Sequence, residues 1–535
     1  MRRKDSAMTA KNEPIHTVVR GTMILTLAVL ASKILGFIYV VPLEHLIGLE
    51  GLTLLNHGYT PYTVLLSLTT LGIPLAVSKY VATHNQLGEY RKGKRLLKRS
   101  FYLLLGLGVV MYLLVFWGSP LFAKWLQSPE STWIIRASAS ALLVVPAMAV
   151  LRGYFQGWQS MGPTGVSQVI EQLVRVVFMV LMAYLFVQAN YTIVNTVALA
   201  SLGTLLGAIA ALVTLLIYWY KRREGIHKKV LASPSIEDQP LLVEYRDLIR
   251  YALPISFVSL AIPLMAFIDL VMYKPILYDL GYSREVVVNW FGILSSTAQK
   301  LIMVPVSIAT AFSLSILPSL AKQYVQGDKE YITKQTEQSM LLLCYILLPA
   351  SVGIYVLAEP IYTTLYSDAL GVTMLEAYTP TIIALGLYTL TASILQAIGK
   401  MKWSMSWLIV ALLLKGLGML LLLPYNAEVG AIHATTIAFT IGLLGNLWGI
   451  LRTYTLSYKR VLTGLGAISL AALIMGLAVY AGNQFSDRFL PDHLFLKMLE
   501  LIVLVLLGVA VYFGLTYRIP WVKTLQIGRR KKLKQ

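Results

Sequence analysis

Runs of about twenty apolar residues recur from one end of this 535-residue chain to the other. A run of that length lets a helix cross the roughly 30 Å hydrocarbon core of a bilayer. Hydrophobic residues make up 57% of the chain and charged residues only 13%, a balance that water-soluble domains do not show. Membrane β-barrels have short alternating segments instead. The pattern therefore predicts an all-α membrane protein that crosses the bilayer many times.

We predict fourteen transmembrane helices, because basic and acidic connections then alternate along the chain. One set of connections carries Lys and Arg, from Arg2 at the start to the tail 529–534, and the other set carries acids, from Glu44 to Asp487. By the positive-inside rule the basic set, and with it both termini, lies in the cytoplasm. The predicted spans are 17–41, 60–82, 100–120, 131–151, 164–187, 192–219, 247–273, 289–321, 338–357, 378–398, 403–424, 428–451, 461–481 and 494–516.

The overall charge and the single cysteine exclude several kinds of protein. This topology explains most of the net charge of +20, which therefore does not indicate a nucleic-acid partner. Cys344 lies in an apolar run, so neither a disulfide framework nor a metal cluster is expected. No Gly-rich phosphate loop is present, so we expect no nucleotide cofactor and no direct drive by ATP. The sequence leaves open whether the membrane potential, Na⁺ or H⁺ provides the drive.

An internal repeat spans the first twelve predicted helices. Residues 74–80 and 318–324 share Pro and Tyr at matching spacing, and residues 156–161 pair with 396–401 through Gln and Met. A six-helix unit duplicated in the same orientation gives two lobes around an axis along the membrane normal, as in transporters that alternate access. The last two helices stand outside the repeat. We therefore predict an N-lobe at 17–220, a C-lobe at 247–452 and two extra helices at 461–516.

One full charge lies inside the apolar stretch 289–320. If this stretch is a helix that enters the bilayer near Asn289, Lys300 lies about 16 Å along it, close to the middle of the hydrocarbon layer. An ammonium at that depth costs at least about 2.5–3.5 kcal/mol on insertion scales, so it should face a polar cavity or a counter-charge. The alternatives are a structural ion pair and a lysine that reaches the interface.

Three further cations fall at similar depth in other spans: Lys33 about 20 Å along its helix, Arg175 about 15 Å and Lys415 about 18 Å. Lys33 and Lys300 lie in different predicted lobes, and both can reach a shared central cavity. A cavity with an excess of cations suits an anion, most naturally a phosphate or pyrophosphate. We therefore predict a diphosphate-binding set formed by Lys33, Lys300, Lys415 and Arg175.

Two acids lie inside the membrane. Glu171 is four residues before Arg175 on one helix, so we expect the two to neutralise each other structurally, with a substrate role as the alternative. Asp269 either pairs with a cavity lysine or holds a coupling cation, and the residues do not separate these alternatives. Lys415 has no obvious partner in its own helix, so it points either into the cavity or between the lobes.

Several short motifs, taken in order, resemble a known family. They are residues 31–37, residues 152–157 continuing through Pro163 to Arg175, and residues 300–320. Together they resemble the polysaccharide-flippase branch of the multidrug/oligosaccharidyl-lipid/polysaccharide exporter superfamily. The similarity is greatest to Gram-positive lipid II flippases of the MurJ/YtgP and stage V sporulation protein B type, and it covers nearly the whole chain.

The resemblance implies export of an undecaprenyl-pyrophosphate-linked peptidoglycan precursor across the cytoplasmic membrane of a bacterium. It implies that cations of spans one, two and eight hold the pyrophosphate, and that a groove beside spans thirteen and fourteen holds the lipid tail. Gram-negative-type members carry arginines where this chain has Lys33 and Lys300, which keeps the charge but loses bidentate geometry. Span two offers only Lys79, near its cytoplasmic end. Expected partners are the lipid-linked precursor, the bilayer and other cell-wall synthesis proteins.

Other functions compete with this one. Within transport, the alternatives are a flippase for another lipid-linked glycan and a drug/cation antiporter of the same superfamily, although an antiporter favours acids in its cavity. From a different class, a membrane-embedded glycosyl- or acyltransferase needs a general base or paired carboxylates at the reacting bond. No such pair recurs here, so we expect a transporter rather than an enzyme.

Overall fold

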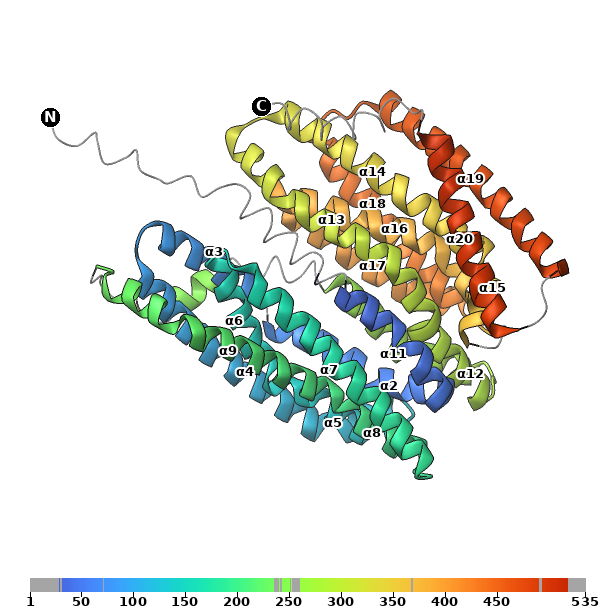
Figure 1. Cartoon of the computed structure of the whole chain (residues 1–535), viewed down its shortest axis with the longest axis horizontal. Helices are drawn as coiled ribbons and strands as arrows, with labels where there is room; N and C mark the ends of the chain where they lie inside the picture. Colours follow the sequence, from blue (N-terminus) through green and yellow to red (C-terminus); the bar gives the residue numbers. More distant parts are fainter. Residues whose placement is uncertain are drawn as a thin grey trace. The chain divides into compact units, whose positions relative to one another are not determined.

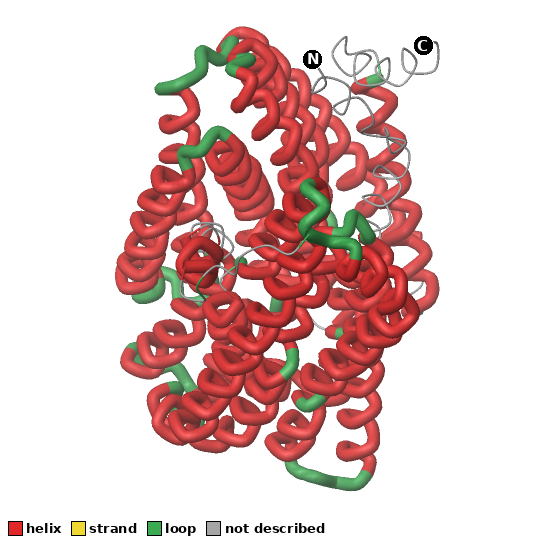
Figure 2. The backbone as a smooth tube through the Cα atoms, turned by 90° about the vertical axis from the view of Figure 1, so that its left-hand side faces the viewer, coloured by secondary structure: helices red, strands yellow, loops and turns green. Residues whose placement is uncertain are grey.

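The computed structural model describes residues 28, 31–70, 72–234, 240, 243–250, 252, 260–366, 369–489 and 493–517, and none of these residues lies in a strand (Figure 2). Thirteen helical stretches among them are long and apolar enough to cross a membrane. They correspond to predicted spans two to fourteen, while most of the first span, 17–41, lies outside the described residues. The all-α membrane fold is confirmed, and the count of fourteen stays a prediction.

The chain divides into two compact units. The first comprises Met1–Gly36, Pro61–Leu121 and Ser131–Ser256, and the second comprises Phe37–Thr60, Phe122–Glu130 and Phe257–Gln535. The second unit thus includes two short segments of the N-terminal half. The domain bounds expected from the repeat, 17–220, 247–452 and 461–516, stay a prediction.

The first unit is built from helices α3 to α9. Their bounds are α3 (Ile73–Gln86), α4 (Tyr90–Trp125), α5 (Thr132–Ala139), the 3₁₀ turn η2 (Ser140–Leu143), α6 (Val145–Gly157), α7 (Met161–Gln188), α8 (Ile193–Ser201) and α9 (Gly203–Leu231). The end of α4, from Phe122 on, belongs to the second unit. So do the first two residues of the 3₁₀ turn η1 (Pro129–Ser131).

The second unit contains the first part of α2 (Val40–Thr70), up to Thr60, together with most of the remaining helices. They are α11 (Ala261–Asp279), α12 (Arg284–Gly292), the π-helical turn η3 (Ile293–Thr297), α13 (Ala298–Gln326), α14 (Lys329–Val356), α15 (Ala358–Tyr366), α16 (Val372–Ala397), α17 (Met401–Leu422), α18 (Gly430–Leu451), α19 (Tyr458–Phe489) and α20 (Leu494–Thr516). The middle of the unit is α16, which packs against α13, α14 and α18.

Helix α2 corrects one expectation. Residues 42–59 were expected to connect spans one and two, but they are helical and are interrupted only at Gly48, whose φ of 63° and ψ of −178° suit glycine. The acids Glu44 and Glu50 lower the hydropathy of this segment and suggested a loop. Its apolar side chains, Leu52 and Leu55 among them, are buried in the second unit, and this burial stabilises the helix.

Close helix pairs in the first unit depend on glycine. Helices α7 and α9 run side by side (Figure 1), and a Cβ atom at Gly207 of α9 would lie 2.6 Å from the Glu171 carbonyl oxygen of α7. Likewise, a Cβ atom at Gly153 of α6 would lie 2.2 Å from the Pro74 carbonyl oxygen of α3. Small residues at such crossings let membrane helices approach until their backbones touch.

We predict that Gly153→Ala destabilises the protein, because the added methyl group meets the rigid backbone of α3 and forces the two helices apart. Overpacking of this kind costs about 1–3 kcal/mol. The matched control is Gly106→Ala on α4, where an added Cβ atom would have no heavy atom within 4 Å. There the better helix propensity of alanine should stabilise by up to about 1 kcal/mol. Thermal unfolding of the detergent-purified variants measures both, and equal melting temperatures would contradict the prediction.

The two C-terminal helices pack against the other helices of the second unit. Helix α19 lies along α14 and pairs with α20 (Figure 1). Their shared core includes Leu341 and Tyr345 of α14 together with Met475 and Tyr512. The Tyr512 hydroxyl donates a hydrogen bond to the Tyr345 carbonyl oxygen at 2.9 Å. These contacts dock both helices on the described second unit through one buried cluster.

Candidate functional site

Lys300 follows directly on a distorted turn of its helix. Residues 293–297 form a π-helical turn, and α13 starts at Ala298, so Lys300 lies in the first turn of α13. Such π-helical turns inside longer helices often mark functional sites. The lysine is partly buried, and its ammonium lies 5.8 Å from the ring centroid of Tyr59 on α2, within cation–π range. Within the described part of its own unit no carboxylate forms an ion pair with it.

Polar contacts hold this turn against α2. The Asn56 side-chain amide donates to the Ser296 hydroxyl at 2.5 Å, and the Thr53 hydroxyl donates to the Val288 carbonyl oxygen at 2.7 Å. A Cβ atom at Gly292 would lie 2.7 Å from the Leu49 carbonyl oxygen, so the two backbones nearly touch. Residues 49–59 of α2 therefore fix the position of the helix that carries Lys300, a supporting role that the sequence did not reveal.

Lys33 belongs to the first unit. It lies in a described helical segment, 31–38, and its side chain is exposed in this structure. Three residues on, Gly36 faces the Gln172 side-chain amide of α7, which a Cβ atom would approach to 3.2 Å. That Lys33 and Lys300 face one cavity stays a prediction.

Arg175 forms the predicted ion pair with Glu171, and a third residue joins them. Glu171 accepts from Arg175 at 2.8 Å through one oxygen and from Arg152 at 2.8 Å through the other. All three side chains are only 12–14% exposed. The cluster is positively charged overall, and Arg152 also donates to the Ser167 hydroxyl at 2.9 Å. Arg152 was not among the predicted site residues, although it lies in the motif 152–157, because it follows the predicted end of span four.

We predict that Glu171→Gln destabilises the protein by about 2–4 kcal/mol, because two largely buried guanidinium groups lose their carboxylate at once. The matched control is Glu330→Gln, which removes the exposed i,i+4 partner of Lys334 and should cost less than about 1 kcal/mol. Thermal unfolding of purified protein compares the two. If Glu171→Gln melts no lower than Glu330→Gln, the arginines have other stabilising partners.

Lys415 and Asp269 form a buried ion pair. Their nearest atoms are 2.5 Å apart, Lys415 is completely buried, and Asp269 is 9% exposed at its side chain. The Lys415 ammonium also donates to the Ala431 carbonyl oxygen at 2.7 Å and to the Thr435 hydroxyl at 2.6 Å. Of the alternatives open for Asp269, the structure forms the pair with a lysine. Lys415 is turned inward within the second unit rather than toward solvent, and this conformation gives no support to its predicted diphosphate role.

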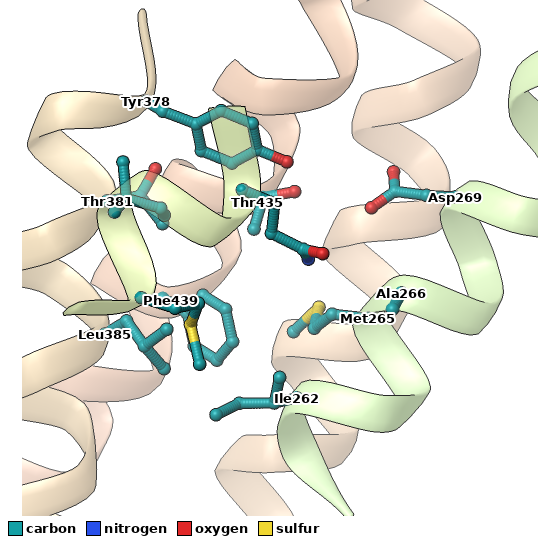
Figure 3. Close-up of a pocket in the computed structure, with 12 residues that line it drawn as sticks. Ile262, Met265, Ala266, Asp269, Tyr378, Thr381, Leu385, Thr435 and Phe439 are labelled. Atoms are coloured by element: carbon teal, nitrogen blue, oxygen red, sulfur yellow. The ribbon is translucent and has the colours of Figure 1, made fainter. Parts of the chain in front are cut away.

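A small cavity adjoins this pair inside the second unit. It has room for about one water molecule, and its polar lining comes from Asp269, Gln299, Tyr378, Thr381 and Thr435. In Figure 3 the Asp269 carboxylate and the Tyr378 hydroxyl point toward the same space. The Tyr378 hydroxyl donates to the Leu294 carbonyl oxygen of the π-helical turn at 3.1 Å. The buried pair and the turn before Lys300 are thus joined through one polar region.

Lys274 is a second buried cation, which the sequence did not reveal. Lys274 was placed just beyond span seven, but α11 continues to Asp279 and Lys274 is 4% exposed. Its ammonium lies 2.9 Å from Nε2 of His57, which is fully buried on α2. Neutral imidazole accepts this bond, so the histidine solvates the ammonium without neutralising it. Lys274 also lines a small polar pocket whose charged members include Glu50, Glu130 and Arg284.

Among the described residues, no group of three or more His, Cys, Asp or Glu side chains could hold a metal ion. The described residues thus hold several cations inside a helical membrane protein: one beside a tyrosine ring, one against a histidine, one paired with an aspartate and two sharing a single glutamate. Such charges inside a membrane protein mark polar pathways and ion or substrate sites. The fold and these sites together define a multi-pass helical membrane protein of the transporter class.

The chain belongs to the polysaccharide biosynthesis protein family, whose model matches residues 18–324. It is 32% identical to the lipid II flippase MurJ of Bacillus subtilis over 96% of this chain and 97% of the relative. It is also 26% identical to stage V sporulation protein B of the same organism, over 80% of this chain and 82% of that protein. The family resemblance seen in the sequence motifs is confirmed.

Solved structures agree on the fold. A lipid II flippase MurJ in an inward closed conformation superposes with a TM-score of 0.64 at 14% identity, covering 92% of this chain and 98% of that one. An inward-facing multidrug resistance MATE transporter of the MOP superfamily gives 0.61 at 16% identity, covering 82% and 97%. The function named for the 32% identical relative, a lipid II flippase, agrees with the expected class of transporter. The chain is a multi-pass protein of the bacterial cytoplasmic membrane.

Proposed function

We propose that this protein is a flippase that moves lipid II, the lipid-linked peptidoglycan precursor, across the cytoplasmic membrane by alternating access. The observation that carries this proposal is the similarity to the Bacillus subtilis lipid II flippase over almost the whole length of both chains. Transport leaves the lipid unchanged chemically, so the protein is not an enzyme. Both termini lie in the cytoplasm, as the distribution of basic connections requires.

Within this function, Lys33 and Lys300 bind the diphosphate. Lys33 is exposed, and Lys300 has no carboxylate partner in the described part of its unit, so both ammonium groups can donate to an anion. A diphosphate offers several charged oxygens, and charge-assisted hydrogen bonds to them are about twice as strong as neutral ones. Arg175 and Lys415 are held by Glu171 and Asp269, which favours structural roles for these two.

The polyprenyl tail lies along α19 and α20. These helices are docked through one face, and their other faces carry exposed apolar side chains such as Leu470, Leu477, Ile502 and Leu506. The exposed apolar faces of α19 and α20 give the isoprenoid chain an apolar surface to lie along, while the diphosphate stays bound to Lys33 and Lys300. The same surface would equally suit bilayer lipid or a partner helix, so the tail needs its own test.

Depletion of the endogenous lipid II flippase in a bacterial host tests the function. Expression of this chain should restore growth and lower the accumulated lipid-linked peptidoglycan precursor to the level of the undepleted strain. The control is the same chain carrying Lys300→Ala, at equal abundance in the membrane. If growth returns without a fall in precursor, the function is not lipid II export. If a different lipid-linked glycan accumulates when this chain is deleted, the protein is a flippase for that glycan instead.

We predict that a diazirine-bearing polyprenyl diphosphate labels α19 and α20. Cross-linked peptides should map to 461–486 and 495–516, and excess unlabelled polyprenyl diphosphate should suppress them, because a specific track saturates. A diazirine phospholipid is the control for general contact with the bilayer. Labels that map elsewhere, or that the competitor leaves unchanged, would remove the tail-binding role.

A further inference from the structure

Three oxygen atoms from two helices converge on the Lys415 ammonium. They are a carboxylate oxygen of Asp269 at 2.5 Å, the Ala431 carbonyl oxygen at 2.7 Å and the Thr435 hydroxyl at 2.6 Å. Asp269 comes from α11, and the other two come from the first turns of α18. The ammonium donates hydrogen bonds to the Ala431 carbonyl and the Thr435 hydroxyl, and the Asp269 carboxylate lies within ion-pair distance of it.

This oxygen set is what a small hard cation binds. Carboxylate, backbone carbonyl and hydroxyl oxygens are the ligands that such cations prefer, and they gather here around a single point. The set carries one negative charge, which a single positive charge balances. The lysine supplies that charge from α17, through a side chain that is entirely buried. Its nitrogen thus stands in the place of a bound ion.

We propose that Asp269, Ala431 and Thr435 form a site for a monovalent cation and that Lys415 fills it permanently. The second unit therefore carries its own cation and needs neither Na⁺ nor K⁺ at this place. The small cavity beside Asp269 adds room for about one water molecule, so removing the lysine side chain leaves space for an ion with a water ligand. The inference bears on the drive of the proposed transport, but the site stands independently of it.

Thermal unfolding of the purified full-length protein in NaCl, KCl or choline chloride tests the site directly. The wild type should melt at the same temperature in all three salts. Lys415→Ala should melt lower in choline chloride and recover in NaCl, because a ligand that binds only the folded state stabilises it. The recovery should be about 2–3 °C when Na⁺ exceeds its dissociation constant about a hundredfold.

Two control variants separate this site from general effects of salt or of lysine loss. Lys402→Ala removes an exposed lysine from the same helix and should create no difference between the salts. Lys415→Ala combined with Asp269→Asn removes the carboxylate as well, so the response to Na⁺ should disappear. A wild type that NaCl stabilises, or a Lys415→Ala variant equally stable in all three salts, would overturn the proposal.

Direct binding of ²²Na⁺ covers the case in which Lys415→Ala does not fold. The wild type should bind no Na⁺ saturably, and saturable binding that Asp269→Asn abolishes would refute the permanently filled site. Neither measurement depends on transport. A chain that passes both but fails to rescue the flippase-depleted strain would overturn only the proposed function.

Discussion

Lys300→Ala is expected to abolish rescue of a flippase-depleted strain while leaving the protein in the membrane at its normal level. The ammonium is partly buried after the π-helical turn, with the Tyr59 ring 5.8 Å away and no carboxylate partner in the described part of its unit. Its removal deletes a charge-assisted contact to the diphosphate, worth about 1.5–3 kcal/mol, or roughly 10- to 150-fold in affinity. It should not unfold the helix, because alanine has the better helix propensity.

The charge rather than the shape of Lys300 is expected to matter. Lys300→Arg keeps the charge and should retain much of the function, whereas Lys300→Gln should behave like Lys300→Ala. Lys322→Ala on the same helix removes a lysine far from the π-helical turn and is the matched control. Growth of the depleted strain, precursor content and the amount of protein in the membrane are measured together. Normal rescue by Lys300→Ala would show that this lysine does not hold the substrate.

Asp269→Asn is expected to be one of the two most destabilising single replacements in the second unit. It leaves the Lys415 ammonium, which is 0% exposed, without its counter-charge, and breaking a buried pair from one side costs about 3–5 kcal/mol. Lys415→Met should cost a similar amount by stranding the carboxylate. The double replacement removes both charges and should cost less than the sum of the single replacements, by about 0.5–3 kcal/mol.

Thermal and denaturant unfolding in choline chloride measure this cycle, so that no alkali cation replaces the ammonium. The control is Glu130→Gln, which breaks the more exposed pair between Glu130 and Arg284 and should cost less than about 1 kcal/mol. Additive effects of the two single replacements would mean that Asp269 and Lys415 are not coupled, despite their 2.5 Å approach.

The local properties of this chain could be predicted from its sequence. Hydropathy and the alternation of basic and acidic connections gave the helical class and the positions of spans two to fourteen, because crossing a bilayer requires a run of apolar residues wherever the run occurs. The pair between Glu171 and Arg175 could also be predicted, since residues four apart on one helix are neighbours. The family followed from the order and spacing of short motifs.

Only the tertiary structure decided which side chains meet between helices. Lys415 forms an ion pair with Asp269 of α11, and Lys274 donates a hydrogen bond to His57, 217 residues away in the sequence. Arg152 forms an ion pair with Glu171 of the neighbouring helix. Residues 42–59 are helical because their apolar side chains are buried within the second unit. In a membrane protein both the lipid-facing and the packed sides of a helix are apolar, so hydropathy does not report how each helix is rotated against its neighbours. That rotation decides which buried charges are paired and which are left to bind a ligand.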